Sequence, residues 1–215
     1  MSFQTIVNIQ QSMNVNNRRV IGQQISRAGY ITTAQYLTAV PWVFTIEPHS
    51  FLYYPDVRNV IQSIDNADRE NPQNITFDTD NLAWFTQYQG DLTTTQVDAL
   101  TLDSVPAPNA QTISVGNLPS VSSTKYVFKA GDFLQLESYV YKVTADVLRG
   151  SLSTVSVNLH RPVIGTPTVG TLTAVGRNVI FPVVAETCPT YTLKPMANGA
   201  YVEWSTAFVF REYIV

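Results

Sequence analysis

The side chains that could do chemistry in this chain are few and lie far apart in the sequence. His49 and His160 are the only histidines, and Cys188 is the only cysteine. A zinc site needs several Cys, His, Asp or Glu ligands at short spacing, and neither histidine is accompanied by such a set. Cys188 precedes Pro189 and has no histidine near it in sequence. We therefore interpret it as a small buried apolar residue rather than a nucleophile.

Two groups of carboxylates could bind a cation or act as an acid and a base. The run Asp78-Thr-Asp80-Asn81 begins like a calcium loop but lacks its central glycine and closing glutamate. Asp65, Asp68 and Glu70 surround Arg69, and this pattern favours a solvated, salt-bridged helix face. No nucleophile elbow, phosphate loop or dinucleotide-binding glycine motif occurs. The sequence therefore predicts a protein that is not an enzyme, with no catalytic, cofactor-binding or metal-binding residue.

Aromatic side chains are frequent in the first half of the chain and could line a groove for a sugar. They are Tyr30, Tyr36, Trp42, Tyr53, Tyr54, Trp84, Phe85 and Tyr88. Aromatic residues in strands belong more often to the core, where they bury a large apolar area. A carbohydrate-binding module or a glycan hydrolase stays an alternative, and each would need these rings in an open groove.

The composition indicates a surface that is polar but largely uncharged. Charged residues make up 13% of the 215 residues, about half the usual share, whereas Thr, Ser, Asn and Gln together number 66. Neutral polar groups lose their water at lower cost than ions do, which suits permanent contacts in a large assembly. A secreted or host-adapted β-protein whose surface has simply accumulated polar residues would have the same composition.

Charge and cysteine content exclude several classes of protein. The net charge is −3, and the four lysines and nine arginines form no basic block beyond the pair Arg18-Arg19. Direct sequence-specific nucleic-acid binding through a basic groove is therefore not expected. The single cysteine allows no intrachain disulfide, which fits assembly in a reducing compartment. We expect no secretion signal and no membrane segment, because no apolar run approaches about 18 residues.

One segment has the pattern of an amphipathic helix, at about residues 55–68. Its apolar residues recur at the helical period and form one stripe. Pro55 and Asp56 suit the first turn, and Asn71-Pro72 ends the helix because a residue before proline leaves the α region. We expect this stripe to pack against a sheet. The stripe consists of Val57, Val60, Ile61, Ile64 and Ala67.

Strands should position most of the remaining residues. Residues 5–20 are rich in Asn and Gln and are interpreted as an extended arm or edge strand, not a helix. Residues 103–124 hold three prolines and several serines and are the best candidate for a loop or linker. The predicted division is therefore an N-terminal arm and β-rich half with the helix (1–102), this linker, and an all-β C-terminal half (125–215).

The C-terminal half predicts an antiparallel sandwich or barrel. Strands recur there about every ten residues, with glycine turns between them. In residues 201–215 the positions Val202, Trp204, Thr206, Phe208 and Phe210 alternate and predict a core strand with even positions inward. In the first half, strands are expected at 30–37, 40–46, 74–77 and 82–88, and 93–102 is mixed. The fold class expected for the whole chain is mainly β with one helix.

Several short motifs along the chain are turn and strand patterns, not chemical signatures. They are Arg18-Arg19-Val-Ile-Gly22, Ser26-Arg-Ala-Gly-Tyr30, Pro41-Trp-Val-Phe44, Tyr54-Pro-Asp-Val-Arg58, Ile64-Asp-Asn-Ala-Asp-Arg69, Lys129-Ala-Gly-Asp-Phe133, Tyr141-Lys-Val-Thr144, Leu159-His-Arg-Pro162 and Val202-Glu-Trp204. Together these motifs resemble tail proteins of long-tailed bacteriophages, in particular structural proteins of the tail tip or baseplate that lie close to the tube.

This resemblance implies a mainly β virion protein without enzymatic activity, assembled in the host cytoplasm. Its expected partners are other copies of itself in a ring coaxial with the tail and other tail or baseplate proteins. Residues 1–29 or 103–124 are expected to become ordered against a neighbouring chain. The alternative is a virion receptor-binding or carbohydrate-binding module at the periphery of the particle.

Overall fold

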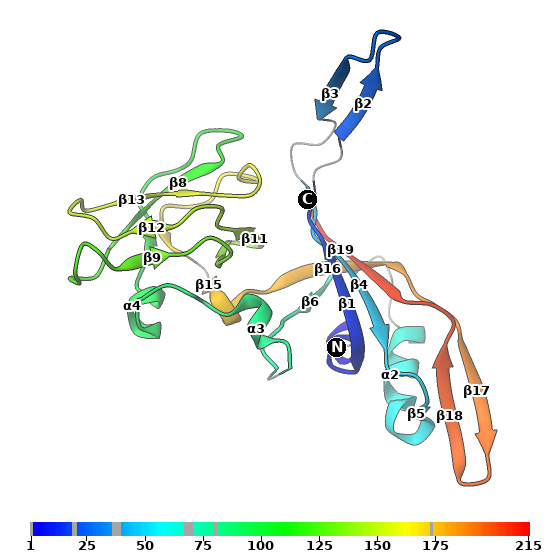
Figure 1. Cartoon of the computed structure of the whole chain (residues 1–215). Coiled ribbons are helices and arrows are strands. Elements are labelled where there is room, and N and C mark those ends of the chain that lie inside the picture. The colour runs from blue at the N-terminus through cyan, green and yellow to red at the C-terminus, as the bar shows by residue number, and fades with distance from the viewer. Residues whose placement is uncertain (1, 19–20, 36–39, 67–70, 80, 173) are drawn as a thin grey trace. The chain divides into compact units, whose positions relative to one another are not determined.

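Strands dominate the computed structural model, which describes residues 2–18, 21–35, 40–66, 71–79, 81–172 and 174–215. All strand pairings described are antiparallel, and no described sheet closes into a barrel (Figure 1). The mainly β fold class with antiparallel sheets is thus confirmed. The chain divides into two compact units, which we call unit 1 (residues 1–17, 41–76 and 181–215) and unit 2 (residues 18–40 and 77–180).

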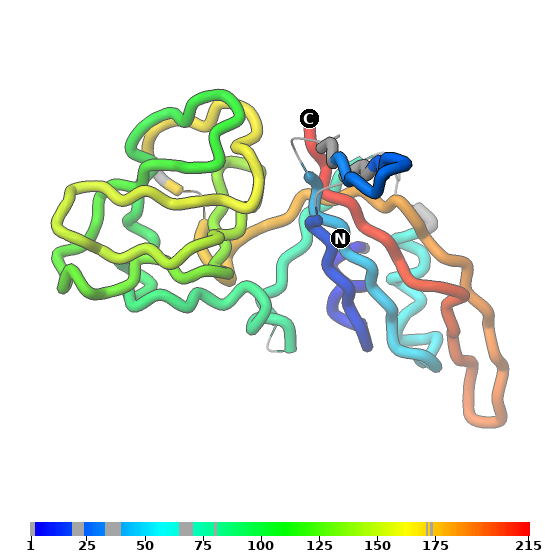
Figure 2. The backbone as a smooth tube through the Cα atoms, turned by 45° about the horizontal axis from the view of Figure 1, so that its top comes forward, coloured from blue at the N-terminus to red at the C-terminus, as the bar shows by residue number. Residues whose placement is uncertain are grey.

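Unit 1 is built on a five-stranded sheet in which β19 lies between β4 and β16. The strands are, in spatial order, β1 (Gln10–Asn16), β4 (Val43–Pro48), β19 (Phe208–Glu212), β16 (Phe181–Thr187) and β6 (Gln73–Ile75). The tube in Figure 2 shows β1, β4 and β19 running side by side. Alternate residues point to one face, so Phe44, Ile46, Phe208 and Phe210 are all buried.

Unit 1 also contains two helices. In α1 (Ser2–Asn8), Phe3, Ile6 and Val7 are buried, and the Phe3 ring lies 4.7 Å from that of Phe210. In α2 (Tyr54–Asn66), the stripe of Val57, Val60, Ile61 and Ile64 is buried, as its spacing predicts. Val57 and Ile61 pack with Val202 of a second, three-stranded sheet. That sheet contains β17 (Tyr191–Met196), β18 (Gly199–Trp204) and β5 (Leu52–Tyr53) in this order.

Unit 2 consists of short strands and two short helices around a core of aliphatic side chains and a few aromatic rings. One sheet contains β13 (Val155–Asn158), β8 (Thr112–Gly116), β7 (Thr101–Leu102) and β14 (Gly170–Thr171). Another contains β11 (Tyr139–Lys142), β10 (Phe133–Leu136) and β15 (Ala174–Val175), and a pair is formed by β12 (Val147–Leu148) and β9 (Tyr126–Phe128). The two helices are α3 (Ala83–Thr86) and α4 (Thr94–Asp98), and a 3-10 turn, η1, spans Gly176–Asn178.

Unit 2 also includes a hairpin that forms a two-stranded sheet of its own. Its strands are β2 (Ile21–Ile25) and β3 (Ile31–Gln35). A bond from the Gly29 amide to the Ser26 carbonyl (2.9 Å) closes the turn, and Gly29 has a φ of 81°. A three-residue hairpin loop needs this left-handed conformation after its turn, which glycine adopts without strain.

Several expectations for single segments are wrong. Residues 2–8 form a buried helix, so the first part of the chain is not a free extended arm, although the edge strand at 10–16 is present. Residues 83–86 are helical rather than a strand, and the expected linker contains strand β8. Residues 201–215 contain two strands, because Ser205 and Thr206 form an exposed bend between β18 and β19. Val202, Phe208 and Phe210 are nevertheless buried, as predicted.

The predicted division into 1–102, 103–124 and 125–215 follows the order of the chain, whereas each unit gathers distant segments. Residues 19–20, 36–39, 67–70 and 80 lie outside the described residues, and the side chains of 65 and 66 are not described. The expected Asp65–Arg69 pair, Asp68, Glu70, Ala67, Tyr36 and Asp80 therefore fall outside the described part.

Candidate interaction surfaces

The two histidines and the cysteine occupy ordinary structural positions. His49 is exposed, and its backbone amide donates to the Ile9 carbonyl (3.0 Å). The Nδ1 atom of half-buried His160 accepts the amide of Lys142 (3.0 Å). Cys188 is half-buried rather than fully buried. Within the described residues, no three His, Cys, Asp or Glu side chains gather where they could hold a metal ion.

The most enclosed carboxylate of unit 2 is Asp132, which the sequence analysis did not single out. Its side chain is fully buried, and its two oxygens accept the backbone amides of Gln89 (2.7 Å) and Lys129 (2.8 Å). Burial raises the pKa of Asp132, and the two amide bonds only partly offset this. Asp132 thus fixes the turn before β10 to the segment after α3.

Arg161 is a second buried charge in the core of unit 2. Its guanidinium donates to the carbonyls of Val40 (2.7 Å) and Val140 (2.9 Å) and lies 5.1 Å from the centre of the Tyr141 ring. These contacts within unit 2 satisfy backbone acceptors and form a cation–π contact. A guanidinium held in this way is a structural cross-link, and the only sequence signal for it is its place in Leu159-His-Arg-Pro162.

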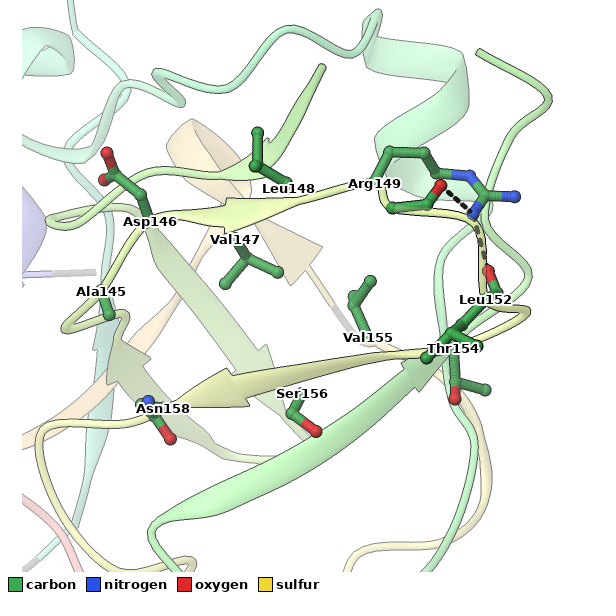
Figure 3. A pocket seen from close by; sticks show the side chains of 11 residues that line it. Ala145, Asp146, Val147, Leu148, Arg149, Leu152, Thr154, Val155, Ser156 and Asn158 are labelled. Atoms are coloured by element: carbon green, nitrogen blue, oxygen red, sulfur yellow. Dashed lines mark hydrogen bonds between the residues drawn. The ribbon is translucent and has the colours of Figure 1, made fainter. Parts of the chain in front are cut away.

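A pocket of about 400 Å³ opens in unit 2 between β12 and β13 (Figure 3). The Leu159 amide donates to the Gln111 carbonyl, so the backbone groups of odd-numbered residues of β13 face β8, whereas those of Ser156 point away from β8. Arg149 at its rim donates to the carbonyls of Pro119, Gly150 and Leu152. The described lining residues include no aromatic ring, histidine or cysteine.

The aromatic residues expected to line a sugar groove do not share one environment. Trp42 is buried, and its ring lies 5.8 Å from that of Phe181. Trp84 is exposed, with its indole nitrogen donating to the Asn81 carbonyl (2.9 Å). Tyr30 is exposed at the tip of the β2–β3 hairpin in a different part of unit 2. The residues are therefore divided between core and surface.

The second, three-stranded sheet of unit 1 has an uncovered edge. Among the described strands, β17 pairs with β18 alone, and it is exposed along most of its length. Leu193 and Met196 expose 50% and 51% of their area. On the pleat, Leu193 lies opposite Val202, so it extends the apolar face that α2 partly covers. This β17 edge offers unpaired backbone groups beside apolar side chains.

The β2–β3 hairpin is the other uncovered apolar feature. Residues 24–32 are all exposed, and Ile25, Tyr30 and Ile31 expose 67%, 76% and 62% of their area. Ile25 pairs directly with Ile31, so both lie on one face of the hairpin. An isolated two-stranded hairpin is only marginally stable in water, and it gains stability when a further strand or surface covers it.

No protein-family model matches the chain, and no curated protein sequence matches it. Among the described helices, none is long and apolar enough to cross a membrane. The chain's candidate function therefore rests on its own surfaces, which present strand edges and apolar side chains for contact.

Proposed function

We propose that this protein is a structural subunit of a bacteriophage tail, in a tube-proximal ring of the tail tip or baseplate. It acts through contacts with copies of itself and with other tail proteins. The observation that carries this proposal is the pair of uncovered strand edges, the β2–β3 hairpin and β17, on a surface with few charges. The motif resemblance to tail proteins supports the same assignment.

Ring closure gives these edges a physical role. An exposed edge strand presents a row of unpaired amides and carbonyls, which invites uncontrolled pairing. In a closed ring, the edge of each subunit pairs with its neighbour, so the assembly uses the edges and covers them. The many Thr, Ser, Asn and Gln residues lose their water at lower cost than charged residues, which favours broad contacts.

A peripheral receptor-binding module is the alternative function. Exposed Trp84 is the observation that favours it, since indole rings stack well on sugars. The pocket in Figure 3 has no aromatic ring among its described lining residues, which gives such a module little to stack a sugar on. The ring subunit therefore remains the better-supported proposal.

Labelling of tailed virions purified from the cells that produce this protein tests the proposal. A gold-tagged antibody against the chain should mark the end of the tail on the tail axis, and averaged images should show a closed ring. Label along peripheral fibres, together with glycan binding that is lost in Trp84→Ala, would instead assign receptor binding. A virion that carries no copy of the chain would refute both proposals.

A further inference from the structure

The β2–β3 hairpin lacks an apolar partner within the sheet to which it belongs. It forms its own two-stranded sheet, and both of its faces are exposed over residues 24–32. Ile25 and Ile31 make one face apolar, and Tyr30 lies on the other. Exposed apolar groups that gather on a single projecting element indicate a contact surface, whereas scattered ones do not.

Charge indicates what covers the hairpin. Residues 18–40, which contain it, have three arginines and no carboxylate. Unit 1 has eight acidic and four basic side chains in its sequence, so its net charge is opposite in sign. Opposite charge steers two protein surfaces together and disfavours like-charged partners. A second copy of this chain supplies such an acidic partner.

Within unit 1, the β17 edge carries exposed apolar side chains, as the hairpin does. It is an uncovered antiparallel edge, as a hairpin strand requires for pairing. Leu193 and Tyr191 place apolar area on one face of that edge, where Ile25 and Ile31 could be covered. Pro195 has no amide hydrogen, so pairing would use the first half of β17.

From these observations we infer that the β2–β3 hairpin of one copy docks on the β17 edge of a second copy and extends its sheet. This inference rests on the proposed function, because it names the contact by which subunits would join. It commits to a specific pair of surfaces and to a partner that is another molecule of the same chain.

The first test compares self-association of matched variants of the whole chain. Ile25→Thr, Tyr30→Ser and Ile31→Thr together remove the apolar tip while threonine keeps strand propensity. The control changes three other exposed apolar residues of unit 2 in the same way: Val105→Thr, Leu152→Ser and Val169→Thr. We expect the hairpin variant to associate about tenfold more weakly than the wild type in sedimentation measurements, and the control to match the wild type.

Charge reversal, measured at low salt, provides a second test that leaves the apolar side chains unchanged. Exposed Arg27→Glu should weaken association at low salt, whereas Arg177→Glu, also exposed in unit 2, should not. The inference would be overturned if the wild-type protein stayed monomeric at every concentration reached. It would also be overturned if the hairpin variants associated as strongly as the wild type. Labelling at the tail end would stand in either case, so the two proposals fail separately.

Crosslinking between copies tests the acceptor surface. In a Cys188→Ser background, chains carrying Tyr30→Cys are mixed with chains carrying Leu193→Cys and treated with a short bis-maleimide. The expected product is a mixed dimer, which cannot arise within one chain. A control mixture replaces Leu193→Cys with Val105→Cys, at another exposed position. Equal yields from the two mixtures would show that β17 is not the acceptor.

Discussion

At the scale of single residues, the buried charges of unit 2 hold backbone groups in place. Asp132 accepts two amides at a turn, and Arg161 donates to two carbonyls beside Tyr141. A buried ionised group is costly unless such bonds satisfy it. Neither group could be recognised from the sequence, because burial depends on segments that the fold brings together from distant positions. Asp132, for example, accepts an amide 43 positions away.

Asp132 predicts a specific dependence of stability on pH. Burial raises the pKa of this carboxyl in the folded protein, whereas the unfolded chain keeps the ordinary value of about 3.9. The contribution of protonated Asp132 to the stability of the fold is therefore fully present below about pH 4. It is lost as the pH rises through the pKa that Asp132 has in the folded protein. Asp132→Asn cannot ionise. Urea unfolding from pH 3.5 to 7 should show the wild-type advantage over Asp132→Asn becoming smaller as pH rises.

The same substitution loses one hydrogen-bond acceptor, so Asp132→Asn should be less stable at the acid end by about 1–3 kcal/mol. Asp98→Asn is the matched control, because Asp98 is exposed on α4. Its difference from wild type should show no such trend. A wild-type advantage that stays constant or grows with pH for Asp132→Asn would contradict the argument from burial.

At the scale of elements, the apolar stripe of α2 is the feature that the sequence predicts best. Ile61 is 3% exposed and packs with Val57 and Val202. Ile61→Asp would bury an unpaired carboxylate and remove an apolar side chain, so we expect a loss of about 3–5 kcal/mol in the free energy of unfolding. Thermal melting of the purified chain measures this loss.

Gln62→Asp tests whether the effect comes from the buried face. Gln62 is exposed on the opposite side of the same helix and also gains a carboxylate on substitution. It should change stability by less than about 0.5 kcal/mol. Equal melting temperatures for Ile61→Asp and Gln62→Asp would mean that α2 is not packed through its stripe.

Local sequence patterns explain which other elements could be predicted. Residues 126–128 and 133–136 are mainly apolar and flank the turn at Gly131, and both are strands, in agreement with the recurring strands expected in residues 125–215. Helices α1 and α3 were missed because they have seven and four residues, too few to establish a period. Their burial decides their structure: Phe3 of α1 packs on Phe210, far along the chain. Weak local propensity cannot reveal such contacts.

At the scale of the whole molecule, the two units could not be read from the order of the sequence. Unit 1 contains residues from the beginning, the middle and the end of the chain, and its sheet joins β1, β4, β19, β16 and β6. Composition and turn residues indicate only where the chain turns. Which strands become partners in a sheet depends on packing between distant strands. The exposed strand edges could not be predicted for the same reason, because a strand is an edge only when no other strand pairs with one of its sides.

This arrangement makes residues 201–215 essential to unit 1. Strand β19 lies between β4 and β16, and buried Glu212 accepts the Trp42 amide (3.0 Å) while Phe210 covers Phe3. Deleting residues 201–215 should therefore separate the sheet into two parts and expose its apolar face. We expect the truncated chain to be aggregated in size-exclusion chromatography and to show no cooperative melting of unit 1.

Removal of Ile214 and Val215 alone is the control, because both follow the last residue of β19 and Val215 is 91% exposed. That shorter deletion should stay soluble and melt close to the wild type. If the chain lacking residues 201–215 were also soluble and melted with one cooperative transition of unchanged amplitude, the central place of β19 in the sheet would be wrong. The cost of the larger deletion should exceed that of any single substitution, since it removes a central strand with partners on both sides.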